Sequence, residues 1–209
     1  MSKLIRYITV SEGGQGEITE KKSRFIANVR PVSSEEEALA FIAEMKKTYW
    51  DARHNCSAYI VGIEHPIMRC SDDGEPGQTA GRPMMDVLEG AGLRNVCVVV
   101  TRYFGGTLLG TGGLIRAYTA AAKAGLDAST IIDRQPGFSV KVTCDYTLVG
   151  KLQYLIASEG LVCADTDYTD VVTMEIPVPS GELDRIKKAI IEATNARAAI
   201  EVSDEMYLN

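Results

Sequence analysis

The sequence predicts an α+β protein of two domains. Strand-like and helix-like patterns alternate along 209 residues, of which 45% are hydrophobic, enough for a sizeable buried core. A break at Pro136 and Gly137 is followed by a pattern of β-α-β-β-α-β, which is typical of a ferredoxin-like plait. We therefore expect a first domain over 1–135 and a plait over 138–209.

In the first domain, strands expected over 3–10 and 21–32 form a hairpin whose turn is the GGQG segment at 13–16. Ser33 and Ser34 precede a helix over 35–50, in which apolar residues recur at helical spacing.

Two further strands are expected over 54–62 and 95–104, and the second is apolar enough to be buried on both faces. A loop over 71–83 ends at Pro83, which suits the start of a helix over 83–92. An alanine-rich helix follows over 114–125. The last strand of this domain is expected over 130–135, ending before Pro136.

The plait pattern places two helices among four strands. The segments, in chain order, are the strand 138–146, the helix 148–160, the strands 161–168 and 171–179, the helix 181–196 and the strand 198–208. The acidic stretch DTDYTD at 165–170 resembles part of a calcium loop but lacks the closing glutamate, so we expect a hairpin there.

Charge is divided unevenly between the two domains. The net charge of −6 argues against a strongly basic nucleic-acid binder. Residues 1–135 hold 16 Lys or Arg and 16 Asp or Glu, whereas 136–209 hold 6 and 12. Any surface that binds anions is therefore expected in the first domain.

Neither a secretion signal nor a membrane span is apparent. The first ten residues have no signal-like apolar run, and no stretch approaches the roughly 18 apolar residues that cross a bilayer. We expect a cytoplasmic protein with no membrane partner and with reduced, structural cysteines. The cysteines, an odd number without a CxxC pair, are Cys56, Cys70, Cys97, Cys144 and Cys163.

A glycine cluster lies in TRYFGGTLLGTGGLIRAY at 101–118. It lacks the lysine that a Walker loop places after its last glycine, and Ile115 occupies the final glycine position of a dinucleotide fingerprint. Two interpretations remain. The glycines allow close packing and tight turns, or their exposed backbone N–H groups bind an anion beside a helix N-terminus.

Two arginines flank the cluster and favour the anion interpretation, and Arg53 with His54 offers a second polar segment. His54 and Cys56 lie about 6 to 7 Å apart along a strand, too far for a nucleophile pair, so His54 is either structural or part of a binding surface. The expected nucleic-acid- or anion-binding residues are Arg53, His54, Arg102, Gly105, Gly106, Gly110, Gly112, Gly113 and Arg116.

A polar loop and a lone tryptophan complete the candidates. The loop contains Asp72, Asp73, Glu75 and Thr79, and it is expected to form turns, with a role in a site as the alternative. Trp50 is expected to seal a core edge, although a tryptophan can also stack on a base. No catalytic residue, metal site or cofactor is predicted.

Four ordered motifs resemble the YigZ/Impact family. They are KKSRFIA (21–27), ARHNCSAY (52–59), SDDGEPGQTAGRPM (71–84) and VVVTRYFGGTLLGTGGLIRAY (98–118). The plait resembles the small C-terminal domain of the bacterial members. One departure is Gln78, which stands where the family's loop has a glycine, so the local turn geometry is in question.

The resemblance implies a first domain similar to domain IV of elongation factor G, a ribosomal-protein-type sheet with helices on one face and a left-handed crossover, and a second domain similar to domain V. Such a crossover departs from the usual right-handed rule. The eukaryotic Impact proteins regulate translation by competing for the activator of a stress kinase that phosphorylates an initiation factor.

Three functions follow as hypotheses. The first is a non-enzymatic, translation-associated regulator that contacts RNA or the ribosome through the first domain, without DNA sequence specificity. The second is an enzyme acting on a small phosphorylated metabolite, with His54 and the polar loop as acid and base groups. The third is a protein-interaction module in translation control that uses the acidic plait.

Overall fold

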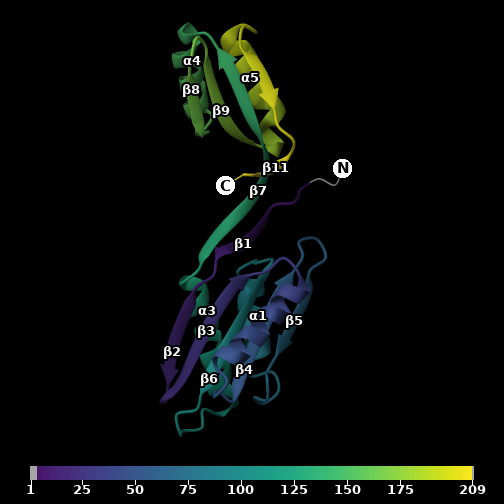
Figure 1. The fold of residues 1–209 in the computed structure, drawn as a ribbon, viewed down its shortest axis with the longest axis vertical. Helices are drawn as coiled ribbons and strands as arrows, with labels where there is room; N and C mark the ends of the chain where they lie inside the picture. Colours follow the sequence, from purple (N-terminus) through teal and green to yellow (C-terminus); the bar gives the residue numbers. More distant parts are fainter. Residues whose placement is uncertain (1–3, 209) are drawn as a thin grey trace. The chain divides into compact units, whose positions relative to one another are not determined.

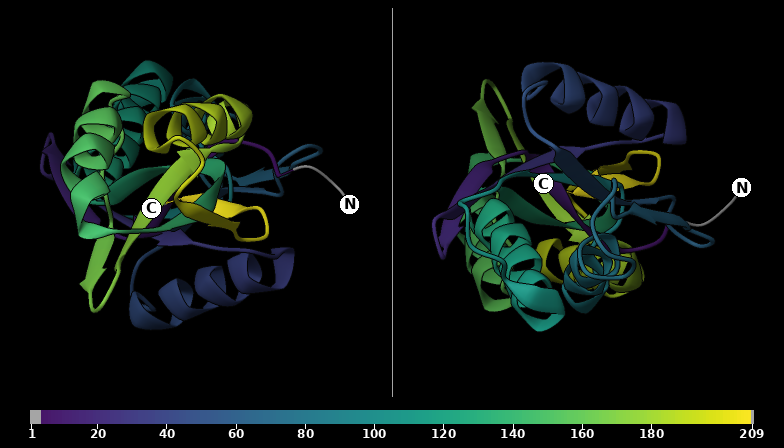
Figure 2. Two further views of the ribbon diagram at one scale, coloured as in Figure 1. Left: turned by 90° about the horizontal axis from the view of Figure 1, so that it is seen from above. Right: turned by 90° about the horizontal axis from the view of Figure 1, so that it is seen from below.

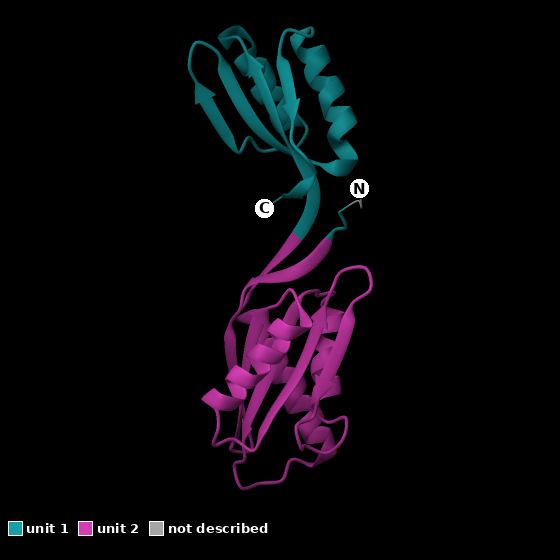
Figure 3. Cartoon of the chain, turned by 45° about the vertical axis from the view of Figure 1, so that its right-hand side comes forward, with its two compact units in different colours: residues 1–6, 134–209 teal, residues 7–133 magenta. Residues whose placement is uncertain are grey.

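The computed structural model describes residues 4–208, which form two compact units (Figure 3). The larger unit is Tyr7–Asp133, and the smaller unit joins residues 4–6 to 134–208. Among the described helices, none is both long and apolar enough to cross a membrane. The α+β, two-unit architecture agrees with the predicted fold class.

The larger unit is built on a five-stranded sheet in which all paired neighbours are antiparallel (Figure 1). In spatial order the strands are β2 (Gln15–Glu20), β3 (Ser23–Pro31), β6 (Val96–Tyr103), β4 (His54–Val61) and β5 (Ile67–Ser71). A further strand, β1 (Tyr7–Glu12), begins the unit outside this sheet.

Helices cover both faces of this sheet (Figure 2). On one face, α1 (Glu35–Thr48) packs with Cys97 and Val99 of β6. On the other, α2 (Gly81–Gly90) and α3 (Gly110–Asp127) pack with alternate residues of the same strand. The expectation of helices on one face is therefore wrong, and the unbroken apolar run of β6 is the reason, because both of its faces are buried.

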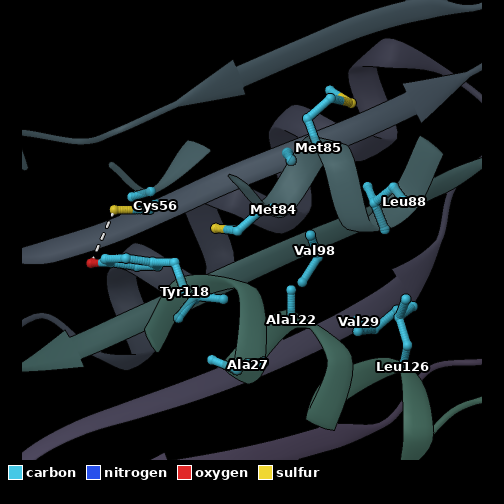
Figure 4. Packing of buried hydrophobic residues seen from close by; sticks show 14 of the residues in the cluster. Ala27, Val29, Cys56, Met84, Met85, Leu88, Val98, Tyr118, Ala122 and Leu126 are labelled. Carbon is cyan, nitrogen blue, oxygen red and sulfur yellow. Dashed lines mark hydrogen bonds between the residues drawn. The ribbon is translucent and has the colours of Figure 1, made fainter. Parts of the chain in front are cut away.

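The helix α1 has the cap that its sequence predicts. The Oγ of Ser34 accepts a hydrogen bond from the N–H of Glu37 at 3.2 Å, and three glutamates occupy the first turn. The core beneath α2 and α3 is shown in Figure 4. At its centre the ring of Tyr118 meets that of Phe25 edge-on, with 5.1 Å between centroids.

The predicted N-terminal hairpin is wrong in its turn. The hairpin joins β2 to β3 through Lys21 and Lys22, which adopt φ values of 45° and 67°, the left-handed region usual for tight hairpin turns. The glycine segment serves close packing instead. A Cβ on Gly16, inside β2, would lie 2.3 Å from the carbonyl carbon of Ala124 in α3.

The strand expected to end before Pro136 continues as β7 (Thr130–Cys144). Proline lacks an N–H, but here the strand continues through it, and Pro136 lies opposite Tyr207 of the short strand β11 (Met206–Leu208). A Cβ on Gly137 would meet the Leu208 side chain at 2.4 Å. This glycine therefore allows a close approach and does not break the strand.

The smaller unit has the predicted plait. Its sheet has β7 in the centre, β9 (Val172–Pro179) on one side, and both β10 (Ala199–Val202) and β11 on the other. Beyond β9 lies β8 (Asp165–Tyr168), so the acidic stretch does form the expected hairpin. The helices α4 (Tyr146–Ser158) and α5 (Leu183–Thr194) pack on its core, and a 3-10 turn (Ser180–Glu182) precedes α5.

Candidate nucleic-acid interface

The predicted site residues lie at one end of the larger sheet, called here the loop end. Register pairs place His54 opposite Arg102 and Arg24 opposite Tyr103, so β4 and β3 begin where β6 finishes. Four connections meet at this end: the turn at 21–22 and the loops at 49–53, 72–80 and 104–109.

A cavity of about 410 Å³ opens at the loop end. It contains three of the residues expected in an anion site, together with aromatic and apolar groups. Its lining is Asp51, Arg53, His54, Arg102, Tyr103, Phe104 and Leu108. The volume lies within the range of about 300 to 1,000 Å³ that is common for ligand pockets, and the lining combines apolar and polar groups as such pockets do.

Arg102 forms a buried ion pair. Its Nη1 lies 2.6 Å from Oε1 of Glu75, and both side chains are more than nine-tenths buried. The same carboxylate oxygen accepts a hydrogen bond from the Tyr118 hydroxyl, which in turn accepts one from the Cys56 thiol. Arg102 thus differs from the free surface cation that we expected, because Glu75 neutralises it.

Burial also shifts the pKa values of two side chains in this group. It raises the pKa of the Tyr118 hydroxyl and of the Cys56 thiol well above their usual ranges, and the nearby Glu75 carboxylate raises both further. A thiol held in its protonated form is a poor nucleophile. Its one proton has a second acceptor nearby, the carbonyl oxygen of Asp72 at 3.0 Å from Sγ, so the group has a structural role.

One nitrogen of Arg102 has no acceptor. Among the described residues, no acceptor lies within hydrogen-bond distance of its buried Nε. The guanidinium carbon lies 5.5 Å from the ring centroid of Phe25 and 5.7 Å from that of Phe104. Part of the side chain is therefore stabilised by aromatic rings, and its hydrogen-bonding capacity is incompletely used.

Asp72 organises the polar loop. Its carboxylate accepts hydrogen bonds from the backbone N–H groups of Gln78, Ala80 and Gly81, at 2.7 to 2.9 Å, where α2 begins. Burial acts to raise the pKa of Asp72, but the three donors outweigh it and the pKa is lowered. Gln78 adopts φ of 62°, so the position where the family has glycine keeps the glycine-type backbone.

The other members of the polar loop are also engaged. Asp73 pairs with Lys46 at 2.5 Å and accepts the N–H of Asn55, and its carbonyl oxygen lies 2.9 Å from Nδ1 of His54. The buried Thr79 hydroxyl donates to the carbonyl oxygen of Pro76. The loop residues do converge with His54, but each carboxylate is used for structure.

The glycines of the cluster divide into two groups. Gly105 serves packing, because a Cβ there would lie 2.0 Å from the carbonyl carbon of Lys22. Gly113 is buried in the first turn of α3. Gly106 and Gly110 need positive φ values, 84° and 71°, and both are exposed, as is Gly112. The exposed group remains available to a ligand.

Four exposed cations at the loop end form no ion pair with any residue in 4–208. Arg53 and Arg116 were expected from the sequence, whereas Lys21 and Lys22 of the hairpin turn were missed. The signal for the lysines was present, because they open the KKSRFIA motif. The neighbouring Arg24 differs, since Glu17 neutralises it at 2.6 Å.

The expectation that Trp50 seals a core is wrong. Its side chain is 81% exposed, directly before Asp51 of the cavity. Phe104 and Leu108 in the cavity lining are 52% and 83% exposed. Large apolar side chains in water beside unpaired cations are typical of surfaces that bind single-stranded nucleic acid. Within 4–208 no group of three potential metal ligands occurs.

Comparison with known proteins covers both units. The family described as Impact N-terminal domain matches residues 21–126, and the one described as Domain of unknown function (DUF1949) matches 142–197. The IMPACT family member YvyE of Bacillus subtilis is 40% identical over 97% of this chain and 93% of its own length. The IMPACT family member YigZ of Escherichia coli is 34% identical over 78% and 81%.

A solved structure is also similar. It is described as a crystal structure of an hypothetical protein, and it is 28% identical, with a TM-score of 0.61. The likeness covers 94% of this chain and 97% of that one, so it extends across both units.

Proposed function

This chain belongs to the Impact family, and on that premise we propose that it is a non-enzymatic, translation-associated protein that contacts RNA, free or in the ribosome, through its loop end. The link to translation comes from the eukaryotic members, as set out above. The link to RNA comes from the chemistry of this chain.

One observation carries the proposal: at the loop end four cations are unpaired within residues 4–208, whereas two of the carboxylates there, Asp73 and Glu75, are held in ion pairs. Lys21, Lys22, Arg53 and Arg116 are exposed and unpaired among the described residues, whereas Asp73 and Glu75 are held by Lys46 and Arg102. The loop end is thus locally positive in a chain of net charge −6. Such a surface attracts a phosphate backbone.

The polar loop supports a binding role over a catalytic one. General acid and base groups need a free position for a proton of the substrate. The Asp72 carboxylate already accepts three backbone N–H groups, and Glu75 holds a buried guanidinium and a hydroxyl.

Co-sedimentation of the full chain with ribosomes, over a salt series from about 50 to 200 mM, tests the proposal. We expect binding that weakens steeply as salt rises and that falls several-fold in Arg53→Ala/Arg116→Ala. The control Lys123→Ala/Lys151→Ala removes two exposed lysines outside the loop end and should bind as the parent does. Nuclease treatment distinguishes a contact with RNA from a contact with protein. Binding that survives complete RNA digestion contradicts an RNA contact and favours a protein partner.

A further inference from the structure

We propose that the loop-end cavity binds one unstacked guanine base of single-stranded RNA, and that Asp51 selects guanine over the other bases. This inference rests on the proposed function and names the chemistry that the same surface would read.

The cavity suits a base better than a phosphate. Its deepest cation, Arg102, is already neutralised by Glu75, and the lining adds a carboxylate at Asp51. A phosphate group placed there would lie beside this carboxylate without an unpaired buried cation in return. Arg53, by contrast, lines the cavity and is exposed and unpaired among residues 4–208, so it can contact the backbone next to an inserted base.

The cavity lining offers one exposed aromatic ring for stacking. The Phe104 ring is half exposed, and the Arg102 guanidinium lies 5.7 Å from its centroid. Bases of single-stranded RNA stack on exposed aromatic rings. A base that enters the cavity thus replaces water on apolar surface that the protein leaves exposed.

Asp51 provides the selectivity. One of its oxygens accepts the Tyr103 hydroxyl at 2.7 Å, which orients the carboxylate and raises the pKa of Tyr103. An ionised carboxylate is only an acceptor, with capacity for further donors. Guanine presents two adjacent N–H donors on its Watson–Crick edge, whereas adenine, cytosine and uracil each place an acceptor beside their donor.

A second lining residue, Arg102, also has unused hydrogen-bonding capacity. Guanine carries a carbonyl oxygen next to its ring N–H, and the Arg102 side chain keeps one N–H, at Nε, without an acceptor among residues 4–208. The cavity lining thus includes an acceptor at Asp51 and, at Arg102, a donor that is unsatisfied among the described residues.

The test compares two uridine-rich RNAs that differ only in one central base, guanosine or adenosine. Full-length protein is titrated into each labelled RNA, and the fluorescence of Trp50, the only tryptophan of the chain, is followed in parallel. We expect about tenfold tighter binding of the guanosine RNA, within the range of one specific base contact. Stacking near the cavity should also quench Trp50.

Asp51→Asn should reduce this preference to about one while the RNA still binds, because the amide adds a donor where guanine has donors. The asparagine oxygen can still accept the Tyr103 hydroxyl, so the fold is retained. Asp127→Asn, a matched change at an exposed aspartate on the last turn of α3, should leave the preference intact.

The outcomes separate the two proposals. Salt-sensitive binding that is equal for both RNAs overturns the guanine site and leaves the proposed function standing. A preference that persists in Asp51→Asn overturns the assignment of Asp51. Absence of binding to either RNA, in free form and in ribosomes, overturns both proposals.

Discussion

The two sheets of this chain differ in how many of their faces are buried. In the larger unit β6 is buried on both faces, with Val98 toward α2 and α3 and Val99 toward α1. In the smaller unit β9 alternates strictly, with Met174 in the core and Thr173 on the other face. A continuous apolar strand thus indicates a sheet that is buried on both faces, and an alternating strand indicates a sheet that is buried on one face.

This difference decides where each unit can place polar groups. The open face of the smaller sheet holds polar residues along its strands, and Glu175 lies opposite Lys141 on one neighbour and Asp165 on the other. The larger sheet has no open face in its centre, so the charged residues of its central strands lie near the strand ends. The binding surface that we propose therefore lies at the loop end.

Among the tests of this comparison, we expect Glu75→Ala to cause the largest loss of stability. The change leaves Arg102 as an uncompensated buried charge, and we expect a loss of about 3 to 5 kcal/mol in the unfolding free energy of the full chain. Denaturant unfolding followed by circular dichroism measures it. Glu75→Ala combined with Arg102→Met removes both charges and should recover most of the loss, whereas a loss below about 1 kcal/mol in the single variant would mean that the pair is not buried in solution.

Alanine substitutions on β6 and β9 distinguish the two sheets directly, with losses of stability of intermediate size. Val98→Ala and Val99→Ala should each destabilise the chain by about 1 to 3 kcal/mol, because neighbouring residues of β6 are both fully buried. On β9, Met174→Ala should cost about 2 to 5 kcal/mol, but its neighbour Thr173→Ala less than about 1. Equal losses at the two β9 positions would contradict the assignment of an open face.

A smaller effect is expected at the cap of α2. Asp72→Ala should destabilise the chain by about 1 to 2 kcal/mol, because three backbone donors lose their acceptor. The pKa of Asp72 is lower in the folded chain than in the unfolded chain, so its contribution is present at neutral pH and declines as pH falls below about 4. Unfolding measured at pH 7 and pH 3 should therefore show a smaller difference between parent and variant at the lower pH; an unchanged difference would exclude this cap role.

The sequence predicted the regular elements better than their connections. Hydrophobic period and caps identified α1, β4, β6 and the plait, because one local pattern decides each of them. The hairpin turn was missed because lysines occupy left-handed positions that usually hold glycine or asparagine. The strand β5 was missed because it is short, mostly exposed and without alternation.

The sequence predicted which residues share the candidate site, but it did not predict the ion pair within it. Arg53, His54 and Arg102 do share one cavity. That Glu75 neutralises Arg102 could not be read from the sequence, since the two lie 27 positions apart and meet only because the polar loop folds against the end of β6. The exposure of Trp50 likewise depends on the contacts made around the end of α1, which no local pattern records.

The most direct test of an RNA-binding loop end is the salt dependence of binding by the full chain to a labelled single-stranded RNA. We compare the parent with a variant carrying Lys21→Gln, Lys22→Gln, Arg53→Gln and Arg116→Gln. If each cation neutralises one phosphate, the slope of log K against log salt should become shallower by about 2.8, at about 0.7 per phosphate. An unchanged slope in the variant, or parent binding that is insensitive to salt, would contradict the account.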